Sequence, residues 1–306
     1  MPRQAPSRST ATDEYRVTVS IELREVKRRI GGVQQVRKVT SALQMIAASE
    51  LQQNRRDLDR VNRYMDALRL LFAHVGPQAD AFEHPLMRRP AGGRCLLIVF
   101  GTERGLCGGF NTELLEAAQR FVAARPHAEV AAYGRVIVRW ARRAGLPLTR
   151  TRRQPRRPMR ETAMSQLVAW AVSRFMAGDL AEVHVLYHRL ESALVQRVVV
   201  EQVLPLTAFP GLPAAVTDPA GDLRHASLEP SAETILHWLV SEWLHLSINL
   251  AFLNSLGSES AARQQATMRA SENAAEMLED LGMQFRRMRQ ESITQEMLEL
   301  SGGRLA

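Results

Sequence analysis

The sequence predicts a mixed α/β protein in which two long terminal helices pair as a coiled coil and a small sheet domain lies between them in the chain. Three observations predict this fold. Apart from Pro2 and Pro6, all prolines fall between Pro77 and Pro230, so both flanks lack the residue that breaks helices. In both flanks, apolar residues recur at steps of three and four, as on one face of a helix. The central segment alternates strand-like and helix-like patterns, which is typical of an α/β domain.

The composition is that of an ordinary globular chain with a basic surplus. Apolar residues make up 45% and charged residues 24% of the 306 residues, which excludes wholesale disorder. The formal net charge of +8 favours an acidic partner. Only Lys27 and Lys38 are lysines, a bias typical of a GC-rich genome, so the arginine count is a weak signal for nucleic-acid binding. The two cysteines, Cys95 and Cys107, cannot form a disulfide framework and indicate a reducing compartment.

Residues 1–18 are predicted to be a disordered tail, and residues 19–75 the N-terminal coiled-coil helix. The tail has basic and hydroxyl residues but lacks the apolar core of a secretory signal. Ser20 is the expected N-cap of the helix, with Glu22 in the first turn. The apolar series of this helix consists of Val26, Ile30, Val33, Val36, Val39, Leu43, Ile46, Leu58, Val61, Met65, Leu68 and Phe72.

Residues 231–306 are predicted to be the C-terminal coiled-coil helix, with Pro230 in its first turn. The apolar run 235–253 contains Glu242. A carboxylate at mid-span costs about 2.5–3.5 kcal/mol in a membrane, so this run is not predicted to cross one. The apolar series of this helix consists of Leu236, Leu239, Trp243, Leu246, Leu250, Leu253, Leu278, Leu281, Phe285 and Met288.

The two predicted helices are too long for a compact globule. At about 1.5 Å per residue they would extend roughly 80 and 100 Å, so their apolar stripes must be buried against each other. Small residues such as Ala47 and Ala261 interrupt the seam, and Gln264 and Gln265 lie in the middle of the second helix. A seam with so little apolar bulk predicts that other chains surround the pair.

Residues 76–230 are predicted to be the central α/β domain and its linker. The strands are expected at 94–100, 128–132, 182–187 and 194–203, and the helices at 113–124, 135–144 and 161–176, in a sheet of parallel character. Asn111 and Thr112 are expected to cap the first of these helices, and residues 211–230 to form the linker.

The glycine-rich turn at 101–109 follows the first central strand, where a phosphate-binding loop would lie. It has neither the Lys-Ser/Thr pair of a Walker A loop nor the GxGxxG spacing, so tight backbone packing is the preferred interpretation. Cys107 lacks a nearby base and is expected to be structural.

Two pairs of histidines are candidate metal ligands. His184 and His188 would share a strand face, and His237 and His245 a helix face, but neither pair has a third ligand at metal spacing. Surface or half-buried histidines are therefore expected, and the sequence contains no recognisable active site, metal site or cofactor site.

The segment Arg150 to Arg160 contains six arginines and two prolines. It is expected to be either a solvated, mobile loop or a surface that docks on an acidic protein face or on anionic lipid. Because no aromatic residues are interleaved with the arginines, the signal for nucleic-acid binding is weak.

Several motifs resemble one family along nearly the whole chain. In order, they are IGGVQQVRKVTSALQMIAAS at 30–49, TERGLCGGFNTEL at 102–114, VVEQVLPL at 199–206, and SESAARQQATMRASENA with RQESITQEMLE near the C-terminus. Together they resemble the gamma subunit of the F-type ATP synthases, which is the central rotor shaft.

This resemblance implies an α/β fold with a long antiparallel coiled coil of N- and C-terminal helices plus a small central Rossmann-like α/β domain. The coiled coil would lie inside a ring of three alpha and three beta subunits (3:3:1), and the central domain would contact the epsilon subunit and the c-ring. The chain would bind no cofactor and catalyse nothing. It would couple proton or sodium flow to ATP synthesis or hydrolysis by rotation, as a peripheral protein on the cytoplasmic face of the bacterial inner membrane.

The resemblance also assigns candidate contact residues. Those expected to contact the beta subunits or affect coupling are Lys38, Thr40, Leu43, Arg263, Arg289, Gln290, Thr294 and Glu296. Leu43 stands where the family usually has methionine, whose replacement by a positive charge impairs coupling. The central-domain turn is represented by Arg104, Gly105, Cys107, Gly108 and Gly109.

The chain departs from the family pattern at several places. It begins about 18 residues early, and Gly31 and Gly32 soften the first helix. These departures suggest a divergent second copy in a bacterium. The alternatives are a Rossmann-like nucleotide enzyme with helical extensions and a basic coiled-coil scaffold or nucleic-acid adaptor, which a DNA complex surviving physiological salt would favour.

Overall fold

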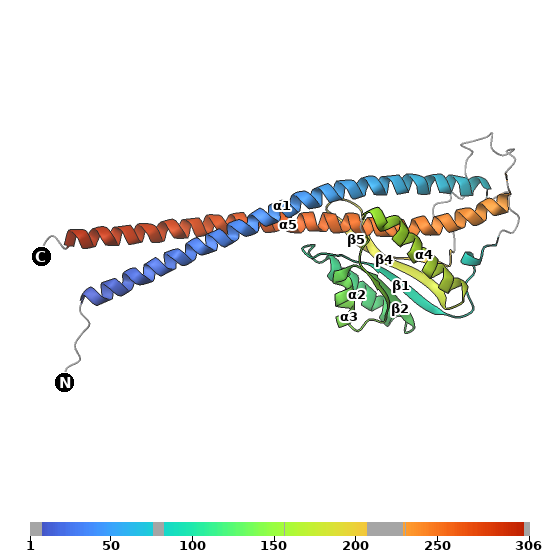
Figure 1. Cartoon of the computed structure of the whole chain (residues 1–306), viewed down its shortest axis with the longest axis horizontal. Helices are drawn as coiled ribbons and strands as arrows, with labels where there is room; N and C mark the ends of the chain where they lie inside the picture. The colour runs from blue at the N-terminus through green and yellow to red at the C-terminus, as the bar shows by residue number, and fades with distance from the viewer. Residues whose placement is uncertain (1–7, 76–82, 156, 207–228, 230, 303–306) are drawn as a thin grey trace. The chain divides into compact units, whose positions relative to one another are not determined.

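The computed structural model describes residues 8–75, 83–155, 157–206, 229 and 231–302, with side chains described from residue 21 to residue 298. The chain divides into two compact units. The outer unit comprises residues 1–46 and 266–306, and the central unit comprises residues 47–265. The first and last helices each contribute to both units (Figure 1).

The element order matches the predicted alternation of strands and helices between two long terminal helices. The elements are α1 (Arg8–Val75), η2 (Pro85–Met87), β1 (Arg94–Phe100), α2 (Phe110–Ala123), β2 (Ala128–Tyr133), α3 (Arg135–Arg143), β3 (Leu148–Arg152), η3 (Arg157–Met159), α4 (Arg160–Met176), β4 (Leu180–Leu190), β5 (Gln196–Leu204) and α5 (Ala232–Gly302).

The central sheet has the strand order β3-β2-β1-β4-β5. The pairings of β1 with β2 and β4, and of β2 with β3, are parallel, whereas β5 runs antiparallel to β4. The expected parallel character therefore fails at β5, because only a short turn at 191–195 joins it to β4 and a parallel pairing needs a long crossover. The edge strand β3 was not predicted, because its sequence LTRTR lacks the apolar run of a buried strand.

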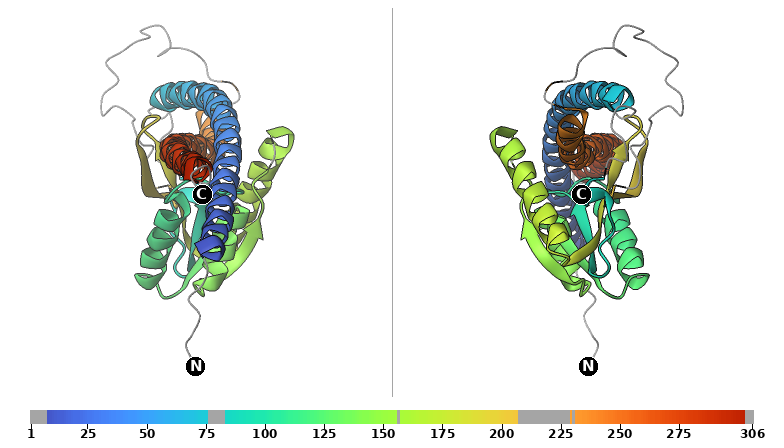
Figure 2. Two further views of the ribbon diagram at one scale, coloured as in Figure 1. Left: turned by 90° about the vertical axis from the view of Figure 1, so that its left-hand side faces the viewer. Right: turned by 90° about the vertical axis from the view of Figure 1, so that its right-hand side faces the viewer.

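The sheet lies between two layers of helices (Figure 2). Leu96, Ile98 and Phe100 of β1 face a core shared with α4 and with the parts of α1 and α5 that belong to the central unit. Leu97 and Val99 point to the opposite face, where they pack with α2 and α3. Because successive strand residues point to opposite faces, a continuous apolar strand is what a sheet covered on both sides requires.

The terminal helices pair in an antiparallel sense in each unit. In the central unit, Asn54 Nδ2 donates to Leu256 O at 3.3 Å, and the rings of Phe72 and Trp243 meet edge to face at 6.0 Å. In the outer unit, the hydroxyls of Ser41 and Ser271 lie 3.2 Å apart. The predicted antiparallel pairing is confirmed.

Both helix starts differ in detail from the predictions. α1 begins at Arg8, inside the predicted tail of residues 1–18, so Ser20 is not its N-cap. No proline or glycine lies between residues 7 and 30, and a formed helix extends at little cost through such a sequence. α5 begins at Ala232, where Ser231 Oγ accepts from Thr234 N at 3.2 Å. Pro230 and most of the predicted linker lie outside the described residues. Within the described residues, no helix has the length and apolarity needed to span a membrane.

Candidate functional site

The glycine-rich turn between β1 and α2 is packed tightly against α3 at its first residue, Gly101. A Cβ atom at Gly101 would lie 2.4 Å from Ile137. Gly134 has a φ of 113°, and its added Cβ would lie 2.4 Å from Gly101 O. Such a conformation and approach are open only to glycine, so close packing is confirmed at Gly101. Farther along the turn, a Cβ added at Gly105 or Gly108 would meet nothing within 4 Å, so packing does not account for those two glycines.

Asn111 fastens the turn from within α2. Its Oδ1 accepts from Thr102 N at 3.1 Å, and its Nδ2 donates to Thr102 Oγ1 at 2.7 Å. The predicted caps at Asn111 and Thr112 are wrong, because α2 begins earlier, with Gly109 as its N-cap. The Asn111 side chain bonds the preceding turn rather than the first turn of its own helix.

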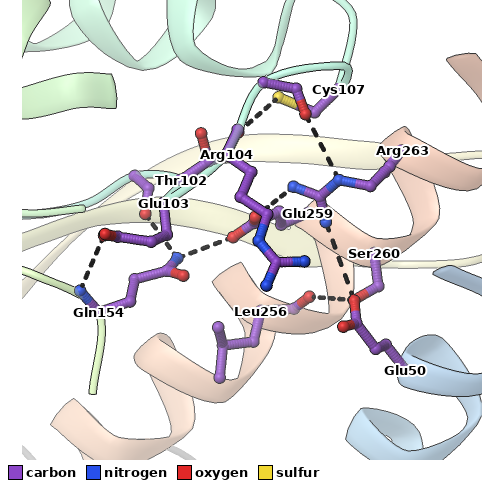
Figure 3. A network of polar contacts seen from close by, with 12 residues as sticks. Glu50, Thr102, Glu103, Arg104, Cys107, Gln154, Leu256, Glu259, Ser260 and Arg263 are labelled. Atoms are coloured by element: carbon purple, nitrogen blue, oxygen red, sulfur yellow. Dashed lines mark hydrogen bonds and ion pairs between the residues drawn. The ribbon is translucent and has the colours of Figure 1, made fainter. Parts of the chain in front are cut away.

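A polar junction joins this turn to α5 (Figure 3). Gln154 Nε2 donates to Gly101 O and to Glu259 Oε2, both at 2.7 Å. Arg263 Nε donates to Gly105 O at 3.4 Å, and its guanidinium also forms an ion pair with Glu259. Three segments far apart in the sequence thus meet through side chains on one helix turn of α5. We call Gln154, Glu259 and Arg263, with the turn 101–109, the polar junction.

The junction contains a buried ion pair. The side chains of Arg263 and Glu259 are 9% and 6% exposed, and a second carboxylate, that of Glu50 on α1, lies 3.9 Å from Arg263. Burial raises the pKa of Glu259, while Arg263 and Gln154 act in the opposite direction. A charged carboxylate is costly to bury alone. The ion pair with Arg263 offsets the cost of burying Glu259.

A cavity of about 460 Å³ opens beside the junction. Acidic lining comes from Glu50, Glu103 and Glu259. Arginines outnumber these carboxylates in the lining: Arg104, Arg135, Arg153, Arg157, Arg160 and Arg263. The surplus of positive charge makes this concave surface suited to acidic groups of another chain.

The arginine-rich segment 150–160 is anchored to other elements and is not a solvated loop along its whole length. It begins in β3, and Arg157 Nη2 then donates to both carboxylate oxygens of Asp57 on α1, at 2.9 and 2.8 Å. Arg160 reaches the same carboxylate at 3.3 Å, and Arg150 lies over the ring of Trp170 at 4.6 Å. The partners come from distant parts of the chain, so the local sequence could not indicate them. Residue 156 lies outside the described residues.

The predicted turn residues occupy two environments. Arg104, Gly105, Gly108 and Gly109 are exposed, whereas Cys107 is buried. Burial, followed by the charge of Glu259, raises the pKa of the Cys107 thiol. A thiol that stays protonated is a poor nucleophile, which agrees with the structural role expected of it.

The predicted contact residues of the outer unit lie on both helices. On α1, Lys38 is exposed, Leu43 is half-buried, and Thr40 is buried with its hydroxyl donating to Val36 O at 3.0 Å. On α5, the exposed set consists of Arg289, Gln290, Thr294 and Glu296. Arg263 belongs to the central unit and differs from them, because its guanidinium is buried and already engaged.

The histidines of β4 are buried, contrary to the expectation of surface or half-buried positions. His188 stacks on Phe110 at 3.9 Å between ring centroids and lies 3.1 Å from Glu113 Oε2. His184 is only 7% exposed. The sequence could not indicate this burial, because it depends on α2 covering that face of the sheet.

The other two histidines have separate partners. His237 lies against His84, with ring centroids 4.8 Å apart. His245 Nε2 lies 3.1 Å from Ser165 Oγ. They therefore do not form the pair that their spacing suggests.

Sequence reasoning missed Gln154 and Glu259, and for Glu259 a signal existed. A second apolar series of α5, not recognised in the sequence, runs through Leu244, Ile248 and Phe252 and continues at three- and four-residue steps through polar residues. These are Ser255, Glu259 and Arg263. Ser255 Oγ donates to Phe100 O at 2.8 Å. Polar residues that continue an apolar stripe indicate a buried polar contact. Gln154 carried no comparable signal.

Comparisons with known proteins agree with this architecture. A family model described as "ATP synthase" matches residues 22–306. The ATP synthase gamma chain of Anaeromyxobacter dehalogenans is 30% identical over 289 residues, covering 92% of this chain and 98% of the relative. The ATP synthase gamma chain of a Geobacter species is 29% identical over 288 residues, covering 92% of this chain and 97% of the relative.

Solved structures show the same fold. A rotor chain of the Euglena gracilis mitochondrial ATP synthase aligns with a TM-score of 0.61 at 15% identity, covering 90% of this chain and 99% of that one. A chain of the Tetrahymena thermophila mitochondrial ATP synthase central stalk and c-ring aligns with a TM-score of 0.55 at 20% identity, covering 76% of this chain and 99% of that one.

Proposed function

The chain belongs to the family of ATP synthase gamma chains and forms the central rotor of an ATP synthase, and from this premise we propose how its surfaces serve rotation. The paired terminal helices turn inside a ring of three alpha and three beta subunits, in a 3:3:1 complex. The central domain contacts the epsilon subunit and the c-ring. Rotation couples proton or sodium flow to ATP synthesis or hydrolysis, and the catalytic sites belong to other subunits.

The observation that carries this proposal is the water-exposed apolar surface of the outer unit. Met45 and Met297 are 69% and 66% exposed, and Ile46 is 51% exposed. A helix pair with many such side chains calls for partners that cover it. Methionine packs adaptably, and this suits a surface that meets different partners as it turns. Further large apolar side chains exposed in this unit are Ile21, Val36, Val39, Met268, Met277, Met283, Ile293 and Leu298.

The exposed polar residues of the outer unit supply contacts that break at every step. We assign this role to Lys38 and to the exposed set on α5 named above, whereas the half-buried Leu43 acts through apolar packing. A hydrogen bond contributes only about 1 kcal/mol net, so such contacts guide the shaft without holding it. Thr40, whose hydroxyl is satisfied by its own helix, acts by packing.

The polar junction has a different role, which is to carry torque. Turning α5 against the central domain would break the hydrogen bonds of Arg263 with Gly105 O and of Gln154 with Glu259. The ion pair within α5 holds Arg263 and Glu259 in place for these contacts. The apolar core around Phe252 and Phe100, whose ring centroids lie 5.2 Å apart, resists the same motion. We therefore assign Arg263 to positioning the turn rather than to direct beta-subunit contact alone.

Co-expression with alpha and beta subunits tests the function. We expect a soluble 3:3:1 ATPase, and we expect the chain alone to aggregate or to remain partly unfolded, because its outer apolar surface stays uncovered. Recovery of a stable monomer that ignores alpha and beta would contradict the proposal. A DNA complex that survives physiological salt would instead favour the nucleic-acid adaptor.

The cellular location follows from the same proposal. We place the chain peripherally on the cytoplasmic face of a bacterial inner membrane, where the c-ring holds it. A pull-down from native membranes, with mass identification of the copurifying subunits, tests this placement. Recovery with soluble proteins only would overturn it.

A further inference from the structure

Three side chains with metal-binding atoms converge at the start of two neighbouring strands in the central unit. Cys95 is the second residue of β1 and lies opposite Glu182 in the register of β1 with β4. His184 lies two residues farther along β4, on the same face as Glu182. The thiol, the carboxylate and the imidazole offer ligand atoms that all lie within 4.8 Å of one another.

The distance between two of these atoms is near that in a tetrahedral zinc site. Zinc bonds of about 2.0–2.3 Å place neighbouring ligand atoms about 3.3–3.6 Å apart. His184 Nε2 already lies 3.1 Å from Glu182 Oε2. The Cys95 sulfur lies within 4.8 Å of both atoms, so a rotation of its side chain toward them would complete three ligands and leave the fourth position to water.

The surroundings orient two of the ligands. Arg89 donates to Glu182 Oε1 at 2.5 Å, so the carboxylate is held through one oxygen while the other faces the imidazole. The His184 ring meets Phe121 of α2 edge to face at 5.1 Å. Hydrogen bonds and packing of this kind fix the first ligands in established metal sites.

The chemistry of the three ligands selects the class of ion. A thiolate and an imidazole are poor ligands for calcium and magnesium, which take oxygen, and they favour zinc or cobalt. A thiolate, a carboxylate and a neutral imidazole together neutralise the two charges of the ion, which suits a half-buried position.

We propose that Cys95, Glu182 and His184 form a zinc site that staples β1 to β4 in the central sheet. On binding, the Cys95 thiol releases its proton to solvent and the sulfur bonds the metal, while His184 binds through the Nε2 lone pair with the proton on Nδ1. The ion would link two strands at the centre of the sheet, so it would stiffen the domain.

Cobalt substitution in the assembled complex tests this site. We expect a near-ultraviolet band from thiolate-to-cobalt charge transfer that titrates to one ion per chain. The band should be absent in Cys95→Ser and weakened in Glu182→Gln and His184→Ala. The matched control is Cys107→Ser, which removes the other cysteine of the same domain and should keep the band.

Difference spectra between the wild-type and Cys95→Ser complexes cancel signals from the other subunits. Identical spectra for these two complexes, or loss of the band in Cys107→Ser, would overturn the proposal. In the first case, His184 and Glu182 form an ordinary hydrogen bond beside an unrelated thiol. Metal analysis of the complex purified from cells gives an independent readout, with one zinc fewer expected in Cys95→Ser.

The pH dependence of binding adds a second readout. Burial and the charge of Glu182 raise the pKa of the Cys95 thiol to about 11, against the opposing charges of Arg125 and Arg89. Burial lowers the pKa of His184, so its imidazole is neutral and ready to bind. Because the metal must displace the thiol proton, the apparent affinity should rise about tenfold per pH unit from pH 7 to 9. A flat profile would exclude the thiolate as a ligand.

Discussion

Removal of the Arg263 guanidinium should leave Glu259 as an uncompensated buried carboxylate. In Arg263→Gln, the side chain at position 263 can still donate a hydrogen bond but carries no charge. Breaking one partner of a buried ion pair costs about 3–5 kcal/mol, and both side chains here are less than one-tenth exposed. The polar junction should therefore open far more often than in the wild-type protein.

Hydrogen exchange measured by mass spectrometry on the assembled complex can detect this opening. Peptides covering 255–265 and the turn 101–109 should exchange roughly a hundredfold faster or more, since each 1.4 kcal/mol is about tenfold. The matched control is Arg289→Gln, which removes the same group from an exposed position on the same helix and should leave these peptides unchanged.

The effect should also depend on pH in a known direction. Burial raises the folded-state pKa of Glu259. The folding stability that this raised pKa contributes is fully present below the unfolded-state pKa, and it is lost as the pH rises through the folded-state pKa. Without Arg263 the folded pKa rises further, so the defect should be greatest near pH 7 and should shrink toward pH 5. Wild-type exchange in Arg263→Gln, or a defect that does not change with pH, would refute the burial argument.

Three further substitutions test other parts of the structure. Gly31→Ala should stabilise the surrounding helix by about 0.5–1 kcal/mol and slow its hydrogen exchange, because an added Cβ meets nothing within 4 Å. Gly101→Ala should prevent assembly, because its Cβ would lie 2.4 Å from the Cβ of Ile137; equal effects of the two substitutions would refute the packing interpretation. Asn54→Ala should destabilise the helix pair by about 0.5–1.5 kcal/mol, because it removes the hydrogen bonds from Asn54 to Leu256 O and to Ser260 Oγ across the two helices. The exposed Gln53→Ala should change the melting temperature of the complex little. Leu43→Lys should lower ATP-driven ion pumping more than ATP hydrolysis in membrane vesicles, and an unchanged ratio would exclude position 43 from coupling.

Much of the secondary structure could be predicted because it depends on neighbouring residues. The absence of proline from both flanks and the spacing of apolar side chains indicated α1 and α5. Helix α4 begins at Arg160, one residue before its predicted start. The predictions failed where the structure depends on residues distant in the sequence. The edge strand β3 was missed because its arginines interrupt the apolar pattern of a strand. Strand β5 runs antiparallel because the short turn before it is too short for a crossover connection.

The candidate site divides in the same way. Local sequence was sufficient to indicate close packing at Gly101, where the first central strand ends in the turn. It could not indicate that Gln154 bonds Glu259, or that Asp57 holds Arg157, since these pairs are about a hundred residues apart. Period and propensity are properties of short segments, whereas the partner of a buried charge exists only once the chain has folded and excluded water around it.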